Sequence, residues 1–174
     1  MSSENVMSKR WLKILCLALS LAMTFLWLGF IFSNSLKTGE ESGEQSSKVH
    51  EVVNQVAQSL GVKEEISEDT VRSGAHFVEF TPLGFLLCLT VVSVWRLGGG
   101  SRLPRLAAWS CLALPLSVAM AGLDEYLQSF SKDRSAELSD VLLDSAGGLT
   151  GLLGFLVLLW IVWLIRKRKN RKNV

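Results

Sequence analysis

The sequence has little cysteine and little histidine, and it lacks the short motifs of common catalytic and metal sites. Its 174 residues include three cysteines and two histidines. Cys16, Cys88 and Cys111 stand singly within apolar runs, so neither a disulfide framework nor a C-x-x-C metal pair is expected. The sequence also contains no H-E-x-x-H pattern, no serine in a nucleophile elbow and no phosphate-binding glycine loop. The absence of these motifs argues against the enzyme classes that such motifs identify. We therefore predict no metal and no cofactor.

Charged residues are missing from long stretches, and this absence indicates the class of protein. Residues 14–32, 106–123 and 145–165 contain none, and residues 80–95 form a shorter uncharged run. A membrane-spanning helix needs about 20 mostly apolar residues, so the shorter run must extend through the polar residues before it. We therefore predict an all-α, polytopic membrane protein. Its four transmembrane helices are expected at about residues 12–32, 74–95, 106–126 and 141–165.

The distribution of charge predicts the orientation of these helices. Basic residues gather in residues 9–13 and 96–105 and form a six-cation cluster in residues 166–172, whereas residues 33–71 hold eight acidic residues against three lysines. By the positive-inside rule both termini are cytoplasmic: residues 1–10 precede a single membrane domain over residues 11–174, whose basic tail is residues 166–174. A cationic cluster directly after a span is typical of a cytoplasmic anchor. We therefore expect membrane lipids as partners and no nucleic acid.

A short amphipathic helix is expected in the acidic, extracytoplasmic loop. Apolar residues recur there at helical spacing, after possible caps at Ser46 and Ser47 and before a stop at Gly61. Such a helix either covers the outer mouth of the bundle or rests on the lipid headgroups, and we favour this role over that of a lid above a site. The apolar positions are Val49, Val52, Val53, Val56 and Leu60.

Polar side chains at the outer ends of the last three spans are the candidate functional residues. Ionisable groups in membrane helices are costly unless they face a partner or a watery cavity. The topology places them together, and we hypothesise a shared extracytoplasmic pocket between spans two, three and four, with Arg134 paired to carboxylates. The candidate binding residues are Arg72, His76, Glu79, Asp124, Glu125, Gln128, Arg134, Asp140 and Asp144, and the candidates for catalysis are His76, Glu79, Asp124 and Glu125.

Small residues and prolines predict how the spans pack and bend. Gly147, Gly151 and Gly154 continue the face of the fourth span that begins with the acidic residues, and small residues let a neighbouring helix come close. Pro82 and Pro115 each remove one helical hydrogen bond, which predicts a bend in the second and third spans.

Two segments resemble the signature segments of the VanZ-like membrane proteins. They are RSGAHFVEFTPLGFLL, residues 72–87, and GLDEYLQSFSKDRSAELSDVLLDSAGGLTG, residues 122–151. Phe80 stands where the family often has Tyr, Asp144 where Asn is common, and Ser-Lys-Asp precedes Arg134 where a Pro-Gly turn is common. The family's first set of polar residues and glycine corresponds to Arg72, His76, Glu79 and Gly84, and its second to Asp124, Glu125, Gln128, Arg134, Asp140 and Gly147.

The resemblance implies a multi-pass protein of a bacterial cell membrane, in a Gram-positive organism, and the name-giving member is associated with teicoplanin resistance. Three functions of the polar cluster stay open. It either recognises an envelope lipid or a lipid-tailed glycopeptide, or catalyses hydrolysis or transfer on a lipid-linked cell-wall precursor, or only holds the helices in place. We favour recognition, and whether the protein is an enzyme and what oligomer it forms stay open.

The orientation is tested by chemical labelling. In a variant without the three native cysteines, cysteines introduced at Lys37 and Lys132 should react with an impermeant thiol reagent in intact cells, because both positions lie in expected external loops. A cysteine at Ser101, in the expected cytoplasmic loop, should react only after the cells are opened. Labelling at Ser101 alone in intact cells would reverse the topology.

Overall fold

The computed structural model describes residues 3–62, 64–100 and 102–172, and these residues form helices and no strands. Position 101, the proposed labelling site, lies outside the described residues, as do residues 1–2 and 173–174 of the two termini. The helices are α1 (Ser3–Ser35), α2 (Gly39–Ser59), α3 (Glu68–Leu97), α4 (Leu103–Ser110), α5 (Ala113–Gln128) and α6 (Leu138–Lys172).

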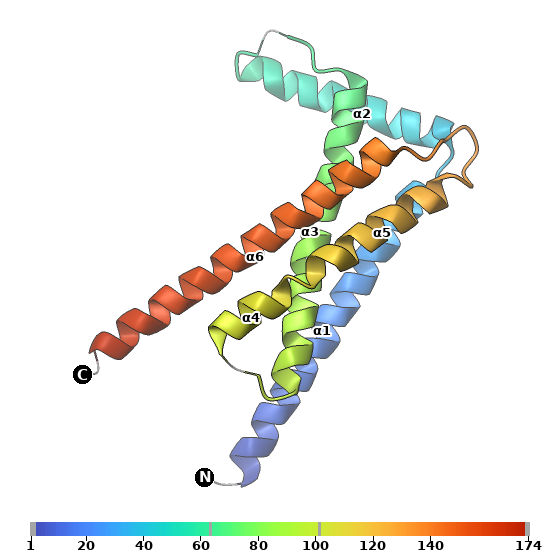
Figure 1. Cartoon of the computed structure of the whole chain (residues 1–174). Coiled ribbons are helices and arrows are strands. Elements are labelled where there is room, and N and C mark those ends of the chain that lie inside the picture. Colours follow the sequence, from blue (N-terminus) through green and yellow to red (C-terminus); the bar gives the residue numbers. More distant parts are fainter. Residues whose placement is uncertain (1–2, 63, 101, 173–174) are drawn as a thin grey trace.

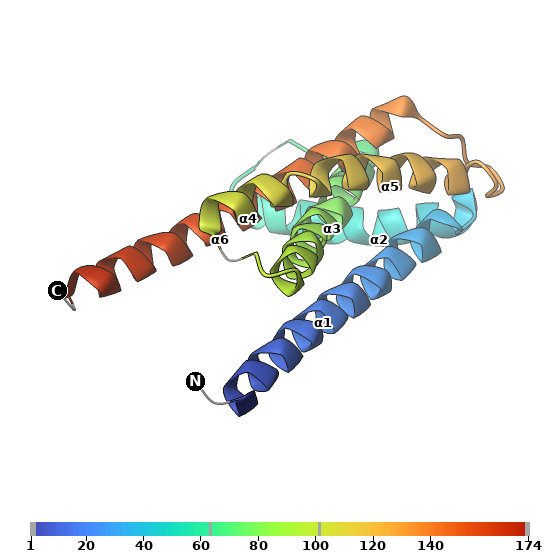
Figure 2. The same cartoon turned by 60° about the horizontal axis from the view of Figure 1, so that its bottom comes forward.

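Four helical segments are long and apolar enough to cross a membrane, so the predicted all-α membrane fold is confirmed. The segments are Met7–Ser35, Glu68–Leu97, Leu103–Gln128 and Leu138–Arg171. α3 is the central helix and contacts every other helix. Both termini lie at one end of the bundle, and α2 lies across the opposite end (Figure 1). A second view shows α5 and α6 on one side of α3 and α1 on the other (Figure 2).

The third span is two helices instead of the single bent helix that the sequence predicted. α4 ends at Ser110 and α5 begins at Ala113, with a turn between them. Pro115 explains the break, because it has no N–H to donate to the carbonyl of Cys111 and its ring crowds that carbonyl. The amide of Leu114 bonds to Cys111 instead, at 3.2 Å. Pro82, in contrast, lies inside α3 without interrupting the helix.

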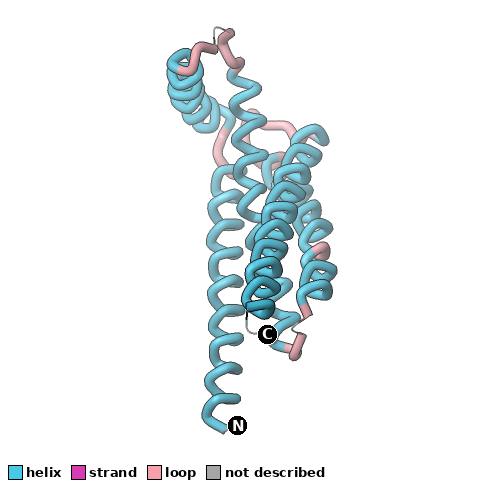
Figure 3. The backbone as a smooth tube through the Cα atoms, turned by 90° about the vertical axis from the view of Figure 1, so that its left-hand side faces the viewer, coloured by secondary structure: helices cyan, strands magenta, loops and turns pink. Residues whose placement is uncertain are grey.

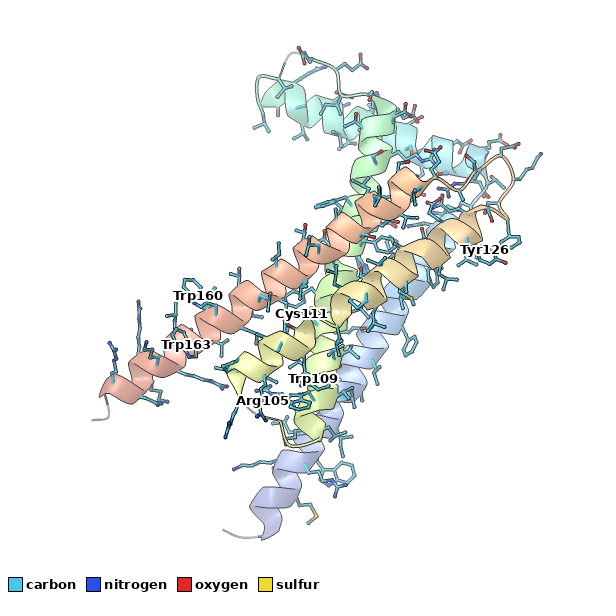
Figure 4. The ribbon with its side chains drawn as sticks, in the orientation of Figure 1. Arg105, Trp109, Cys111, Tyr126, Trp160 and Trp163 are labelled. Carbon is cyan, nitrogen blue, oxygen red and sulfur yellow. The ribbon has the colours of Figure 1, made fainter. Side chains whose placement is uncertain are left out.

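Exposed aromatic residues mark the two ends of the spans. Tyr126 lies on α5 near the α2 end, whereas Trp109, Trp160 and Trp163 lie toward the other end (Figure 4). All four side chains are at least 40% exposed in the isolated chain. Tyrosine and tryptophan are enriched where membrane helices meet the lipid headgroups. These positions are therefore consistent with helices that cross the bilayer between the α2 end and the end that holds the termini.

The helix between the first two spans begins earlier than predicted. Thr38 caps α2 with its side chain, and Glu41 bonds back to the amide of Thr38, so the helix starts at Gly39 and not near Ser46. The hydrogen bonds from Thr38 hold the pKa of Glu41 below its ordinary value. The predicted stop is confirmed, because Gly61 has a φ of 87°. The tube view shows α2 almost end-on, across the top of the bundle (Figure 3).

Glycines bring the backbones of α3 and α6 into direct contact. A Cβ atom on Gly147 would overlap the carbonyl oxygen of Phe77, and one on Gly151 would overlap that of Thr81. Gly84 of α3 in turn faces the backbone of Gly148. Gly154 does not share this contact, because nothing lies within 4 Å of the corresponding Cβ position. The contacting face continues from Gly151 through the buried side chain of Phe155, one full turn later, so Gly154 points to the side of the contact.

The glycine contact predicts a stability difference between two otherwise similar variants. Gly151→Ala should lower the free energy of unfolding by about 1–3 kcal/mol, because the added methyl group forces the two backbones apart. Gly154→Ala should leave stability unchanged or raise it by up to about 1 kcal/mol, because alanine favours the helix. Unfolding of each purified protein in mixed detergent micelles, followed by circular dichroism, measures both. Equal stability of the two variants would contradict the close α3–α6 contact.

Candidate functional site

The polar side chains predicted from the sequence meet at the α2 end of the bundle, where α3 and α6 contribute a histidine and an aspartate. Nδ1 of His76 lies 3.3 Å from Oδ1 of Asp144, and the side chains are 13% and 0% exposed. Within the described ranges this is the only acid–base pair closer than 4.0 Å. The contact does not have hydrogen-bond geometry, and both oxygens of Asp144 have no hydrogen-bond partner. Asp144 therefore has unused capacity to accept hydrogen bonds or bind a cation.

Asp124 of α5 is held from two sides. It is 1% exposed, it accepts a short hydrogen bond from Oγ of Ser35, and its second oxygen accepts one from Nε2 of Gln128 at 3.1 Å. Gln128 is fully buried, and its own oxygen has no partner. The spacing of Asp124 and Gln128, one turn apart, makes this pair possible. Ser35 comes from α1, so the first span takes part in the site.

Glu125 ties α5 to the start of α6. It is 3% exposed, and its Oε2 accepts a hydrogen bond of 2.8 Å from the backbone amide of Glu137. Its other oxygen is buried without a partner. One donor atom from each of His76, Asp124 and Glu125 lies within 4.8 Å of the others. These three side chains are the group in the described residues that could hold a metal ion.

Glu79 is also held by α1, which the predicted pocket between spans two, three and four left out. Asn34 donates a hydrogen bond of 2.9 Å to its carboxylate, and the indole of Trp27 donates one of 2.8 Å to its backbone carbonyl. Asn34 and Ser35 were missed as site residues. Their signal in the sequence is weak: they are uncharged polar residues at the end of an apolar run, a place where such residues are common.

Arg134 lies against the end of α1 instead of against a carboxylate. Its guanidinium donates to the backbone carbonyls of Asn34 and Ser35, both at 3.4 Å, which are among the carbonyls that a helix end leaves unpaired. No carboxylate in the described residues lies within 4.0 Å of it, so the expected ion pairs are absent there. Burial, followed by the charge of Arg72, holds the pKa of Arg134 below its ordinary value. An arginine nevertheless stays charged in proteins.

The turn before Arg134 explains one departure from the family pattern. Asp133 has a φ of 59°, a left-handed conformation that aspartate tolerates better than most residues and that glycine adopts freely. The Ser-Lys-Asp sequence thus makes the turn for which a Pro-Gly pair is common. The carbonyl of Lys132 accepts a hydrogen bond of 2.9 Å from the amide of Gly39, so this turn also anchors the start of α2.

Two adjoining cavities open beside the cluster, beneath the first half of α2. The smaller has a volume of about 90 Å³ and the larger one of about 260 Å³. His76 and Glu79 line the smaller cavity, and Arg72 and Arg134 line both. From α2, the side chains of Ser42 and Ser46 line both as well, so α2 covers these cavities. Asp140 lies partly exposed at the start of α6, outside the lining of either cavity.

Four membrane-length helices around a buried cluster of acids and a histidine define a multi-pass membrane protein with a polar site at one end of its bundle. The sequence model of the VanZ/LLP1 family matches residues 19–163, and the chain belongs to this family. The VanZ-like resemblance is thereby confirmed, and the match includes both signature segments. No curated protein and no solved structure matches the chain.

Proposed function

We propose that this VanZ-family membrane protein recognises the phosphate-bearing headgroup of an envelope lipid in the cavities beneath α2. We further propose that this recognition contributes to resistance against teicoplanin-type antibiotics. The family supports the second statement only through its name-giving member. The first statement is supported by the charges and the size of the cavities.

The main observation behind this proposal is that two arginines at the cavities have no carboxylate partner. Arg72 comes from α3 and Arg134 from the turn before α6, and both line the same two cavities. Neither has a carboxylate within 4.0 Å among the described residues. Lys37, which lines the smaller cavity, bonds only to the neutral side chains of Asn34 and Gln45, at 2.8 and 2.7 Å. In the smaller cavity these three cations face a single acidic residue, Glu79, and this excess of positive charge favours an anion there. The larger cavity is also lined by acidic residues, Glu68, Asp69, Asp133 and Glu137, so the smaller cavity is the proposed phosphate site. Arginine forks suit the oxygens of a phosphate.

The size of the cavities favours a headgroup over a whole antibiotic. Pockets for drug-sized ligands have volumes of about 300–1,000 Å³. The volumes here, about 90 and 260 Å³, suit a phosphate and a few neighbouring atoms. A lipid whose headgroup enters beneath α2 while its tail stays in the bilayer meets this requirement. The rigid cup of a glycopeptide antibiotic does not fit into such a space.

Catalysis on such a lipid is the second candidate function, and the His76–Asp144 contact favours it. His76 lines the smaller cavity and lies 3.3 Å from a buried carboxylate, so it is placed to exchange a proton with a bound headgroup. The products would be those of hydrolysis or transfer at the phosphate. Recognition needs fewer assumptions, because it needs only the charges and the space.

Lipid binding tests the proposal directly. Purified protein in detergent should bind a polyprenyl phosphate and should not bind the polyprenol with the same tail. Arg72→Gln and Arg134→Gln should each weaken binding by roughly tenfold or more, because each removes a charge-assisted hydrogen bond of about 1.5–3 kcal/mol. Arg105→Gln, an exposed arginine at the opposite end, is the matched control and should bind normally. Native mass spectrometry measures the bound fraction.

The same samples separate the two candidate functions. Release of inorganic phosphate from the bound lipid, lost in His76→Gln, would support catalysis, whereas binding without release would support recognition. Equal binding of the phosphate and the alcohol would contradict both, because the arginines would then have no anion to bind.

Antibiotic protection tests the family-derived part of the proposal. A glycopeptide with an acyl tail gathers at the outer leaflet, where the α2 end is expected to lie. Overproduction of the protein should therefore raise the inhibitory concentration of teicoplanin more than that of vancomycin, which has no tail. His76→Ala and Asp124→Asn should remove the protection, because both side chains belong to the buried cluster.

Membrane abundance of each variant, measured by immunoblot, is the control for this experiment. Unchanged susceptibility to teicoplanin in cells that contain the wild-type protein in verified amounts would contradict a role in resistance. It would leave lipid recognition to be judged by the binding experiment alone.

A further inference from the structure

We propose that His76, Asp124 and Glu125 bind a divalent transition-metal ion, such as Zn²⁺ or Mn²⁺, and that Asp144 orients His76 as a ligand. This metal site does not depend on lipid recognition. The sequence predicted no metal, because the three donors come from two helices and form no short motif.

The first support is the convergence of suitable donor atoms. One atom from each of the three side chains lies within 4.8 Å of the others. Ligand atoms of a tetrahedral ion with bonds of about 2.0–2.2 Å are about 3.3–3.6 Å apart, so side-chain rotations of about 1 Å bring the donors to bonding distance. Imidazole nitrogen with carboxylate oxygens is a donor set for zinc and manganese.

The second support is that several buried side-chain oxygen atoms of the cluster have no hydrogen-bond partner. Glu125 is 3% exposed and one of its oxygens has no hydrogen-bond partner. Asp144, fully buried, leaves both oxygens without one, and the oxygen of Gln128 is buried in the same way. Buried polar groups without partners are rare because each one costs free energy. A cation among them provides the missing partner.

The third support is that neighbouring groups hold each proposed ligand in place. Asp144 contacts Nδ1 of His76, and the amide of Glu137 bonds to one oxygen of Glu125. Asp124 accepts hydrogen bonds from Ser35 and Gln128. Metal ligands are commonly oriented by such second contacts, and a carboxylate against the other nitrogen of a ligating histidine is the best-known example.

Arg134, which the sequence predicted to pair with carboxylates, does not neutralise this group. Arg134 donates to backbone carbonyls of α1 and has no carboxylate within 4.0 Å among the described residues. Asp124, Glu125 and Asp144 therefore face one histidine without a permanent positive charge in contact. A divalent ion supplies the charge that this arrangement lacks.

Metal binding to the untagged, full-length protein tests the site. After treatment with a chelator and dialysis against Zn²⁺ or Mn²⁺ without added lipid, elemental analysis should find about one ion per chain, as for a single structural site. His76→Gln and Glu125→Gln should each lower the affinity by roughly a hundredfold, and Asp144→Asn by roughly tenfold, as for a residue that orients a ligand. His50→Gln and Glu51→Gln are matched controls outside the cluster and should bind like the wild type.

A measurement on the wild type keeps the test valid if a variant fails to fold. Pulsed electron paramagnetic resonance of the Mn²⁺-loaded protein should detect coupling to an imidazole nitrogen, and the signal should persist in His50→Gln. Absence of bound metal in the wild type would overturn the proposal. So would unchanged affinity in both His76→Gln and Glu125→Gln.

Discussion

The backbones of α3 and α6 touch through glycines, and the polar site depends on this contact. Between helices in a membrane the hydrophobic effect supplies little attraction, so close backbone packing has to supply it. Gly84, Gly147 and Gly151 leave no room for side chains at the crossing. Asp144 lies one turn before Gly147, and the approach of the two helices places it 3.3 Å from His76. The same contact that stabilises the bundle thus brings the histidine and the aspartate together.

Hydrogen bonds between three segments of the chain close the site at the α2 end. Hydrogen bonds join the turn at residues 129–137 to the end of α1 and the start of α2: Ser131 and Arg134 donate to the backbone carbonyl of Ser35, and the amide of Gly39 donates to the carbonyl of Lys132. These bonds pair backbone groups that the helix ends would otherwise leave free. They also leave several carboxylate oxygens of the cluster unpaired. Buried polar atoms without partners are local exceptions of a kind that is typical of functional sites.

Predictions from local patterns succeeded where a pattern has one structural meaning. The uncharged runs became four membrane-length helical segments, and Gly61 ends α2 where the sequence predicted a stop. Predictions failed in places where a pattern is compatible with two structures. Pro115 breaks its span whereas Pro82 does not, although both are prolines in apolar runs. The polar residues of the site were found on three spans, but the contribution of α1 was missed because Asn34 and Ser35 carry no charge.

Hydropathy and charge along the chain were enough to establish the class of protein, the number of spans and the polar residues gathered at one end, because the bilayer acts on each segment separately. Which atoms meet was decided only by the packing of the helices. The predicted topology puts Arg134 near the acids, yet it lies on carbonyls of α1. Helical spacing puts Gly154 on the same face as Gly147, yet of these two only Gly147 meets α3. Spacing assigns a residue to one side of its own helix, whereas the neighbour on that side depends on how closely and at what angle the helices cross.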